Sequence, residues 1–372
     1  MTRGVSIVIP TWNGLDLLKQ FLPSVIAAAR RYCEQAAAPT EIVVVDDGST
    51  DGSVEWLVTE GFVDADTPAA SVPESPTARP GRASNDQPEW TIHIALRLVR
   101  SKANCGFGES CNRGFAAAKH RLVFLLNNDV EPAVDSIAPL TENFEVDSVF
   151  AAHCRVFDIE SGRECGTGKV GSFSRGFIRV HRGYDVEEQI GNALATPGEL
   201  YSIFASGGSS MFDRLKFIET GGFESLLAPF YWEDVELSYR SWKRGYSVLY
   251  EPRSVARHRV SSTIRKLNRT AVRKIEQRNR LIYHWIHLHD RRMLVSHALW
   301  VLMLALTSPL RQKADFISSC VAALRLLPAI RKRRREEKLA CIRTDRDVFA
   351  IFRSLESRSD IVDWNLRSRP IE

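Results

Sequence analysis

The sequence lacks the cysteine patterns that build zinc sites or disulfide frameworks. Its seven cysteines are scattered through 372 residues, with no Cys-x-x-Cys pair and no histidine at the spacing of a zinc ligand. An odd number of dispersed cysteines is typical of free thiols in a reducing compartment. The cysteines therefore predict a protein of the cytoplasm rather than a secreted, disulfide-bonded one.

Long apolar runs are also missing. The first residues are followed at once by a short apolar stretch, without the longer hydrophobic region and small-residue cleavage site of a secretory signal. The most apolar segment, residues 293–306, is shorter than the roughly 20 residues that cross a bilayer, and basic residues flank it. It predicts a core helix or an interfacial one. We expect a cytoplasmic protein, with a peripheral position on the cytoplasmic face of the membrane as an alternative.

Positive charge is in modest excess, with a formal net charge of +5. A content of 44% hydrophobic and 26% charged residues is typical of a globular protein, and the length allows two or three units. The positive excess is concentrated in residues 253–346. Such a region fits nucleic acid, anionic lipid or a solvated helix face. Aromatic residues are not interleaved with its arginines, which disfavours nucleic acid as a partner.

Short β-branched runs alternate with helical stretches in the first third of the chain. The runs predict strands buried on both faces of a parallel sheet, at residues 5–9, 42–45, 92–99 and 122–126. Helices are predicted between them, at residues 15–30, 53–59 and 109–119. The alternation predicts an α/β fold with a Rossmann-like, mostly parallel central sheet flanked by helices. Ligands of such sheets lie beyond the carboxyl ends of the strands.

The later parts of the chain are less regular. Residues 64–90 are rich in proline, alanine, serine and threonine and predict a disordered insertion. Short strands are predicted at residues 172–179 and 201–205, and a helix at residues 232–244. Past residue 267 we expect only helices.

Polar residues that can bind a nucleotide follow the second predicted strand. A carboxylate at a strand end, here Asp46 or Asp47, can accept a hydrogen bond from a ribose hydroxyl or a base N–H. Gly48 permits a sharp turn, and Ser49 or Asp51 can cap the next helix. The alternative is a plain strand–turn–helix with capping residues.

A second polar group, Asn127-Asn128-Asp129, follows the fourth predicted strand. Hard cations such as Mg²⁺ or Mn²⁺ prefer oxygen ligands, and such a cation would neutralise a diphosphate. Asp129 supplies one carboxylate, and His258 is a further candidate ligand. The alternatives are an Asx turn at the strand end and a structural histidine.

Acidic and aromatic residues meet at the predicted start of the helix at residues 232–244. Glu233 or Asp234 could take the proton of an acceptor hydroxyl, while Tyr231 and Trp232 stack on a sugar face. The alternative is that the acids only favour the positive end of the helix dipole. The paired glycines Gly207 and Gly208 allow close approach of a ligand to the backbone, or form a tight turn.

Taken together and in this order, these features resemble the family 2 glycosyltransferases, which have the GT-A fold. The resemblance covers roughly residues 4–260. It rests on the opening strand and loop at 5–13, the DDGSTD run within 42–51, residues 104–108 with 112–114, residues 125–129, and Gly221-Gly222-Phe223 followed by Trp232-Glu233-Asp234. The runs 124–132 and 229–234 are most like bacterial rhamnosyltransferase-type members that build surface polysaccharides.

The resemblance implies a role for each site residue. The nucleotide-sugar is expected to be bound by Pro10, Thr11, Trp12, Asn13, Asp46, Asp47, Asn104, Gly106, Asn128, Gly207 and Gly208. Asp129 and His258 would hold Mg²⁺ or Mn²⁺. Asp234 would be the catalytic base, with Glu233 beside it, and Tyr231 and Trp232 would bind the acceptor. The reaction would invert the anomeric centre and move a sugar from dTDP-rhamnose or a UDP-sugar to a hydroxyl of a glycan or lipid-linked acceptor.

Two features depart from the family pattern. The metal motif is Asn-Asn-Asp rather than Asp-x-Asp, and the insertion at residues 64–90 separates the second and third strands. Among rivals, a sugar nucleotidyltransferase would carry a basic, glycine-rich loop after the first strand, which residues 10–14 do not offer. A non-catalytic nucleotide-binding scaffold would not need the acids Glu233 and Asp234.

The resemblance also suggests a division of the chain. Residues 1–262 form the expected GT-A domain, with a nucleotide-binding half at 1–132 and an acceptor-binding half at 133–262. Residues 263–372 form a basic, helical C-terminal region. This region would dock on an anionic membrane, or pack on the catalytic domain or on a second subunit of a homodimer.

Overall fold

The structure is a computed structural model that describes residues 4–65, 94–184, 200–259, 268–308, 315–356, 358 and 361–363. The strands are β1 (Val5–Thr11), β2 (Thr40–Asp46), β3 (Val63–Asp64), β4 (Ala95–Arg100), β5 (Leu122–Leu126), β6 (Val130–Pro132), β7 (Val149–Asp158), β8 (Glu164–Gly166), β9 (Lys169–Ser174), β10 (Phe177–Tyr184), β11 (Ser209–Asp213), β12 (Ser247–His258) and β13 (Ile361–Asp363). The helices are α1 (Leu15–Ala36), α2 (Ser53–Thr59), α3 (Phe107–Ala117), α4 (Ile137–Glu142), α6 (Arg214–Thr220), α7 (Glu233–Lys243), α8 (Arg269–His287), α9 (Arg291–Thr307), α10 (Asp315–Arg325), α11 (Leu327–Ala340) and α12 (Asp345–Leu355). Short 3-10 turns lie at Asn143–Glu145 and Ser225–Leu227.

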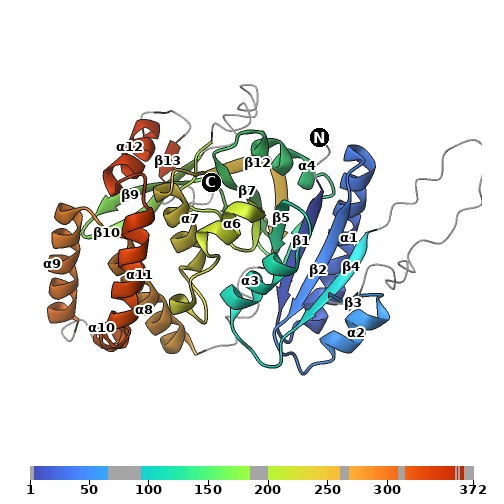
Figure 1. Ribbon diagram of the computed structural model, residues 1–372, viewed down its shortest axis with the longest axis horizontal. Helices are drawn as coiled ribbons and strands as arrows, with labels where there is room; N and C mark the ends of the chain where they lie inside the picture. The colour runs from blue at the N-terminus through green and yellow to red at the C-terminus, as the bar shows by residue number, and fades with distance from the viewer. Residues whose placement is uncertain are drawn as a thin grey trace, which may run out of the picture.

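One large sheet runs through the molecule in the order β3-β4-β2-β1-β5-β11-β7-β12-β6, with β8 paired to β7 (Figure 1). The strands from β3 to β5 are parallel. β11 is antiparallel to both β5 and β7, β12 is parallel to β7, and β6 is antiparallel to β12. The predicted mostly parallel, Rossmann-like α/β fold is therefore confirmed. The carboxyl ends of β1, β2 and β5 meet at one edge of the sheet.

The sheet is buried on both faces because its central strands are apolar at most positions. All residues of β5 are buried, and every residue of β1 and β2 is buried as well. Alternate side chains point to opposite faces. Val8 joins a core that includes α3, α6 and α7, whereas Ile7 and Ile9 join a second core that includes α1 and α4. Helices thus cover both faces of the sheet, as the continuous β-branched runs indicate.

Two predicted strands differ in the structure. Residues 172–179 contain a hairpin turn rather than one strand, because Arg175 and Gly176 adopt positive φ angles of 49° and 73° between β9 and β10. In residues 201–205, only Tyr201 forms an isolated bridge, with Leu249. The predicted insertion at residues 64–90 lies outside the described residues, apart from the first two positions.

The C-terminal region packs against the rest of the chain through helices and one short strand. Helices α8, α10 and α11 contact one another, and α12 packs against β9 and α7 (Figure 1). β13 pairs with β10 in a small three-stranded sheet, so the expectation of helices alone past residue 267 is wrong at β13. None of the helices in the described ranges is long and apolar enough to span a membrane.

Buried ion pairs join this region to α7. Lys243 lies 2.9 Å from Asp345, and both side chains are almost fully buried. Glu236 pairs with His287 of α8 at 2.6 Å, again with both side chains inaccessible. Because unpaired buried charges are costly, these pairs fix the position of α7 relative to the C-terminal helices.

Candidate active site

The loop after β1 is held to the loop after β2 by hydrogen bonds between side chains and backbone. Asn13 Oδ1 accepts from the Thr50 N–H at 2.8 Å, and the Asn13 N–H donates to Ser49 Oγ at 2.8 Å. Asp51 Oδ2 accepts from the N–H of Leu15 at 2.9 Å. Trp12, in the same loop, remains exposed. The two loops therefore form one rigid rim at the carboxyl edge of the sheet.

Asp46 and Asp47 are both buried, and their carboxylates accept hydrogen bonds from different loops. The Asp47 carboxylate accepts from the N–H groups of Cys105 and Gly106, both at 2.9 Å, and so fixes the loop before α3. Asp46 Oδ2 accepts from the N–H groups of Gly48 and Ser49 at 3.2 and 3.1 Å. Both predicted nucleotide-binding acids thus organise the loops that line the edge.

The Asn127-Asn128-Asp129 segment crosses from β5 to β6 beside that rim. The Asn127 N–H donates to the Gly208 carbonyl at 3.0 Å. Asn128 Nδ2 donates to Thr11 Oγ1 at 2.9 Å. The segment therefore joins the glycine pair predicted at the donor site to the loop after β1.

The metal candidates lie together. Asp129 Oδ1 is 3.2 Å from His258 Nε2, at the end of β12. The nearby Asn127 Oδ1 is buried and has no hydrogen-bond partner among the described residues. The chemistry of these oxygen and nitrogen donors is compatible with a hard divalent cation, for which a bound diphosphate would have to supply further ligands. Within the part of the chain that the structure describes, three or more His, Cys, Asp or Glu side chains do not converge on one point.

Asp234 is attached to the same edge through the glycine pair. Its Oδ2 accepts from the Gly207 N–H at 3.3 Å, and its Oδ1 accepts from the Val235 N–H at 2.8 Å. A Cβ placed on Gly207 would lie 3.5 Å from the Asp234 Cβ, so these backbones approach closely. Asp129 and Asp234 are therefore linked through a short path: Asn127, Gly208 and Gly207.

Burial raises the pKa of both acids at the start of α7. For Glu233 the main cause is desolvation, and the neighbouring charge of Asp234 adds to it. For Asp234, desolvation raises the pKa, while the N–H groups of Val235 and Gly207 and the charge of Lys169 lower it. A carboxylate with a raised pKa is a stronger proton acceptor, as a general base requires.

Lys169 is a site residue that sequence reasoning missed. Its side chain is buried, its Nζ has no hydrogen-bond partner among the described residues, and the Nζ lies 4.5 Å from the Phe204 ring centroid. Desolvation lowers its pKa to about 8, although the charge of Asp234 opposes that shift. No sequence signal marks this lysine, because it is a lone charge that the chain brings next to the glycine loop only on folding.

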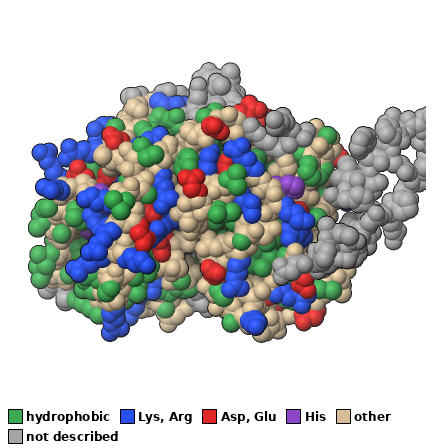
Figure 2. Space-filling view, viewed as in Figure 1, with side chains coloured by type: hydrophobic (Ala, Val, Ile, Leu, Met, Phe, Trp, Pro, Cys, Tyr) green, Lys and Arg blue, Asp and Glu red, His purple; other side chains and the backbone are tan. Residues whose placement is uncertain are grey.

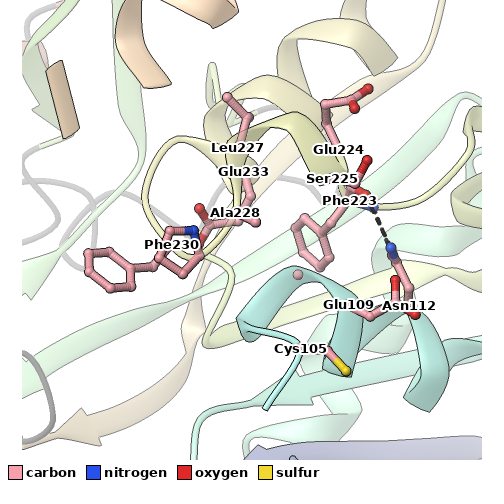
Figure 3. Close-up of a pocket in the computed structure, with 12 residues that line it drawn as sticks. Cys105, Glu109, Asn112, Phe223, Glu224, Ser225, Leu227, Ala228, Phe230 and Glu233 are labelled. Carbon is pink, nitrogen blue, oxygen red and sulfur yellow. Dashed lines mark hydrogen bonds between the residues drawn. The ribbon is translucent and has the colours of Figure 1, made fainter. Parts of the chain in front are cut away.

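Glu233 faces a small cavity between α3 and the loop before α7 (Figure 3). The cavity has a volume of about 50 Å³, and its walls include Cys105, Glu109, Ala228 and Phe230. Glu233 Oε2 is buried and finds no hydrogen-bond partner among the described residues. The acid is thus aimed at a polar and aromatic hollow rather than neutralised by a cation.

The loop that carries Tyr231 and Trp232 is held in an unusual conformation. Both residues have positive φ angles, 72° and 77°, which side-chain-bearing residues rarely adopt and which cluster at functional sites. Asn279 Nδ2 of α8 donates toward the Phe230 and Tyr231 carbonyls, both at 2.9 Å. Trp232 is half-buried, with its ring centroid 5.5 Å from that of Tyr283. The C-terminal region therefore shapes the predicted acceptor side.

The predicted site residues gather at one edge of the sheet. The Gly106 loop, held by Asp47, lies against Pro229 in the loop before α7, where a Cβ on Gly106 would be 3.2 Å from the Pro229 carbonyl oxygen. Asn104 is exposed beside that loop, and Pro10 is buried in β1. The proposed nucleotide, metal and acceptor groups thus share one contact network.

Comparison with known proteins gives matches to sugar-transferring enzymes. Residues 6–60 match the family described as Glycosyl transferase family 2. The undecaprenyl-phosphate 4-deoxy-4-formamido-L-arabinose transferase of Pectobacterium carotovorum subsp. carotovorum (strain PC1) is 31% identical over 140 residues, 38% of this chain and 33% of that protein. The protein of that name from Yersinia enterocolitica serotype O:8 / biotype 1B is 29% identical over 155 residues, 41% of this chain and 38% of that protein. The chain spans about a third of the length of these curated relatives.

Solved structures share the fold at low sequence identity. GalNAc-T7 with UDP, GalNAc and Mn²⁺ superimposes with a TM-score of 0.54 at 18% identity, over 78% of this chain and 49% of that one. S. aureus TarS 1–349 in complex with UDP-GlcNAc gives a TM-score of 0.50 at 12% identity, over 95% of this chain and 91% of that one. With its matching N-terminal segment and its named relatives, the chain is similar to the family 2 glycosyltransferases, and its structure has the GT-A fold.

Proposed function

We propose that this protein is an inverting glycosyltransferase that moves a sugar from a nucleotide-diphosphate-sugar to a hydroxyl of a glycan or lipid-linked acceptor. The observation that carries the proposal is the contact path from Asp129 through Gly208 and Gly207 to Asp234. It brings a candidate cation ligand and a candidate base to one edge of the sheet. The relatives named as undecaprenyl-phosphate sugar transferases favour a lipid-linked acceptor in cell-surface polysaccharide synthesis. The donor would be dTDP-rhamnose or a UDP-sugar.

In this mechanism each residue has a defined task. The rim formed by the loops after β1 and β2 holds the nucleoside, and Asp47 keeps the Gly106 loop in place against it. Asp129, with His258, would hold Mg²⁺ or Mn²⁺, which when bound would neutralise the diphosphate leaving group. Asp234 takes the proton of the acceptor hydroxyl as that oxygen attacks the anomeric carbon from the opposite side. Glu233 and the aromatic pair Tyr231 and Trp232 orient the acceptor.

The same reasoning divides the chain. Residues 1–132 would bind the donor and residues 133–262 the acceptor, and residues 263–372 would complete the acceptor side. Asn279 and Tyr283 of α8 support this division, since they hold the loop at residues 230–232.

Donor hydrolysis by the purified protein tests the proposal and the metal together. We expect release of nucleoside diphosphate from a UDP-, dTDP- or GDP-sugar with Mn²⁺, and its loss with EDTA. Asp129→Ala should lower the Mn²⁺-dependent rate by at least about a hundredfold, because metal stabilisation of a leaving group is worth several kcal/mol. The matched variant Asp135→Ala removes an exposed carboxylate nearby and should leave the rate unchanged. Equal hydrolysis by Asp129→Ala and the wild type would contradict the assignment.

The pH dependence of transfer tests the role of Lys169. Its positive charge lowers the pKa of Asp234, so Lys169→Met should raise that pKa. Because the base acts when deprotonated, the acidic limb of kcat/KM should move to higher pH by about one unit, as a nearby partly screened charge is worth on the order of 1–2 kcal/mol. Lys169→Arg keeps the charge and should restore the limb. An unmoved limb in a folded Lys169→Met protein would exclude this coupling.

A further inference from the structure

Helix α9 presents an apolar stripe to solvent. Its residues Val295, Leu299, Leu302 and Leu306 are each more than half exposed, and Met303 lies among them. These positions fall on one side of a helix, at steps of three and four residues. His297 is the buried residue of the helix. The stripe is thus continuous and belongs to a face that nothing in the described chain covers.

The opposite side of α9 is fixed to the protein through His297. The His297 Nδ1–H donates to the Gly176 carbonyl at 2.7 Å, and the Trp285 Nε1–H donates to His297 Nε2 at 3.2 Å. The rings of His297 and His284 stack with centroids 5.0 Å apart. Since the imidazole is bonded through both nitrogens, α9 cannot turn its apolar stripe inward without losing these contacts.

The neighbouring helix α10 repeats the pattern. Ile317, Val321 and Leu324 are exposed at steps of four and three residues, whereas Ser319 and Ala323 face the protein. Helices α9 and α10 contact each other. The exposed apolar residues of these two helices, with the basic residues around them, are called the α9 surface below.

Basic side chains outnumber acidic ones on α9 and the helices that follow it. The described residues of α9, α10 and α11 carry nine Lys and Arg against three Asp and Glu. Arg291 and Arg292 border a groove of about 460 Å³ whose walls include Val295, Leu299 and Trp300. Figure 2 shows hydrophobic side chains at the left edge, where α9 lies in Figure 1, beside Lys and Arg over α11. Apolar groups next to a positive rim match the acyl boundary and headgroups of an anionic bilayer.

We propose that the α9 surface docks on an anionic lipid bilayer, with α9 lying in the plane of the interface. The helix has 17 residues, fewer than the roughly 20 that span a bilayer, so its stripe can enter only the outermost part of the membrane. A second copy of this chain is a poorer occupant, because a two-fold contact would bring the same arginines of both copies together. This docking is separate from glycosyl transfer and does not depend on the proposed enzymatic activity.

Vesicle flotation of the full chain tests the docking. At low salt the protein should float with vesicles of phosphatidylcholine and phosphatidylglycerol, and not with phosphatidylcholine alone. The double variant Leu299→Glu/Leu302→Glu should weaken the affinity for anionic vesicles by at least about tenfold. The reason is that each leucine buried in the bilayer contributes to the free energy of binding. The control Leu215→Glu/Ile218→Glu places two acids at the same spacing on exposed positions of α6 and should bind normally.

Each outcome of that experiment is decisive. Equal binding by both double variants, or no binding of the wild type to anionic vesicles, would overturn the proposal. So would a stable dimer in light scattering that only Leu299→Glu/Leu302→Glu disrupts, because it would give the α9 surface to a second copy. Donor hydrolysis should stay normal in both variants, so a failure of docking is distinct from a failure of the proposed function.

Discussion

Asp234→Asn is expected to lower kcat by about a thousandfold while the protein stays folded. A positioned general base contributes roughly 10²–10⁴-fold, and an amide cannot take the proton of the acceptor hydroxyl. The asparagine side chain keeps one oxygen that can accept from the Gly207 or Val235 N–H. Removing a half-buried charge whose pKa is raised by desolvation also leaves stability intact or improves it. Transfer to a defined acceptor, measured beside thermal unfolding, gives both quantities.

Two further variants make the result specific. Asp147→Asn is the same chemical change on a fully exposed aspartate and should leave both kcat and thermal unfolding unchanged. Glu233→Gln should raise the KM for the acceptor more than it lowers kcat, because Glu233 lines the cavity rather than the Gly207 loop. Turnover of Asp234→Asn near the wild-type rate would exclude it as the base and favour a nucleotide-binding scaffold.

The nucleotide-binding half could be predicted from the sequence because its signals are local. Continuous apolar runs gave β1, β2 and β5, and the polar residues after them had to meet once these strands were parallel and adjacent. The helix predicted at residues 53–59 matches α2. These elements are fixed by patterns that extend over only a few residues.

The acceptor side could not be predicted in the same way, because it depends on contacts between distant residues. Gly176 is a local turn signal within residues 172–179, but nothing in the sequence marks the contact of its carbonyl with the distant His297. Asn279 reaches the loop at residues 230–231 from α8, almost fifty positions away. The role of Lys169 follows only from its burial next to Phe204. Such long-range polar contacts leave no periodic signal in the sequence.

Asp345→Ala is expected to lower the free energy of unfolding by about 3–5 kcal/mol, because it leaves a buried charge without its partner. Asp345 Oδ1 accepts from Lys243 Nζ at 2.9 Å and from the Tyr239 hydroxyl at 2.8 Å. Its Oδ2 accepts from the N–H groups of His289 and Asp290. Loss of these bonds would loosen α7 from the turn between α8 and α9. Denaturant unfolding of the full chain measures the change.

The effect of Asp345→Ala on kcat shows whether the C-terminal region is only attached to the catalytic domain or is a structural part of it. Lys243 lies at the end of the helix that begins at Glu233 and Asp234, so a displaced α7 should also reduce kcat under conditions in which Asp345→Ala remains folded. The matched variant Asp347→Ala lies on α12, the helix of Asp345, and removes only the exposed capping box with Thr344. It should cost about 1 kcal/mol and leave kcat unchanged. Equal stability of the two variants would show that the Lys243–Asp345 pair does not hold α7, and the C-terminal region would then be an appendage rather than part of the acceptor site.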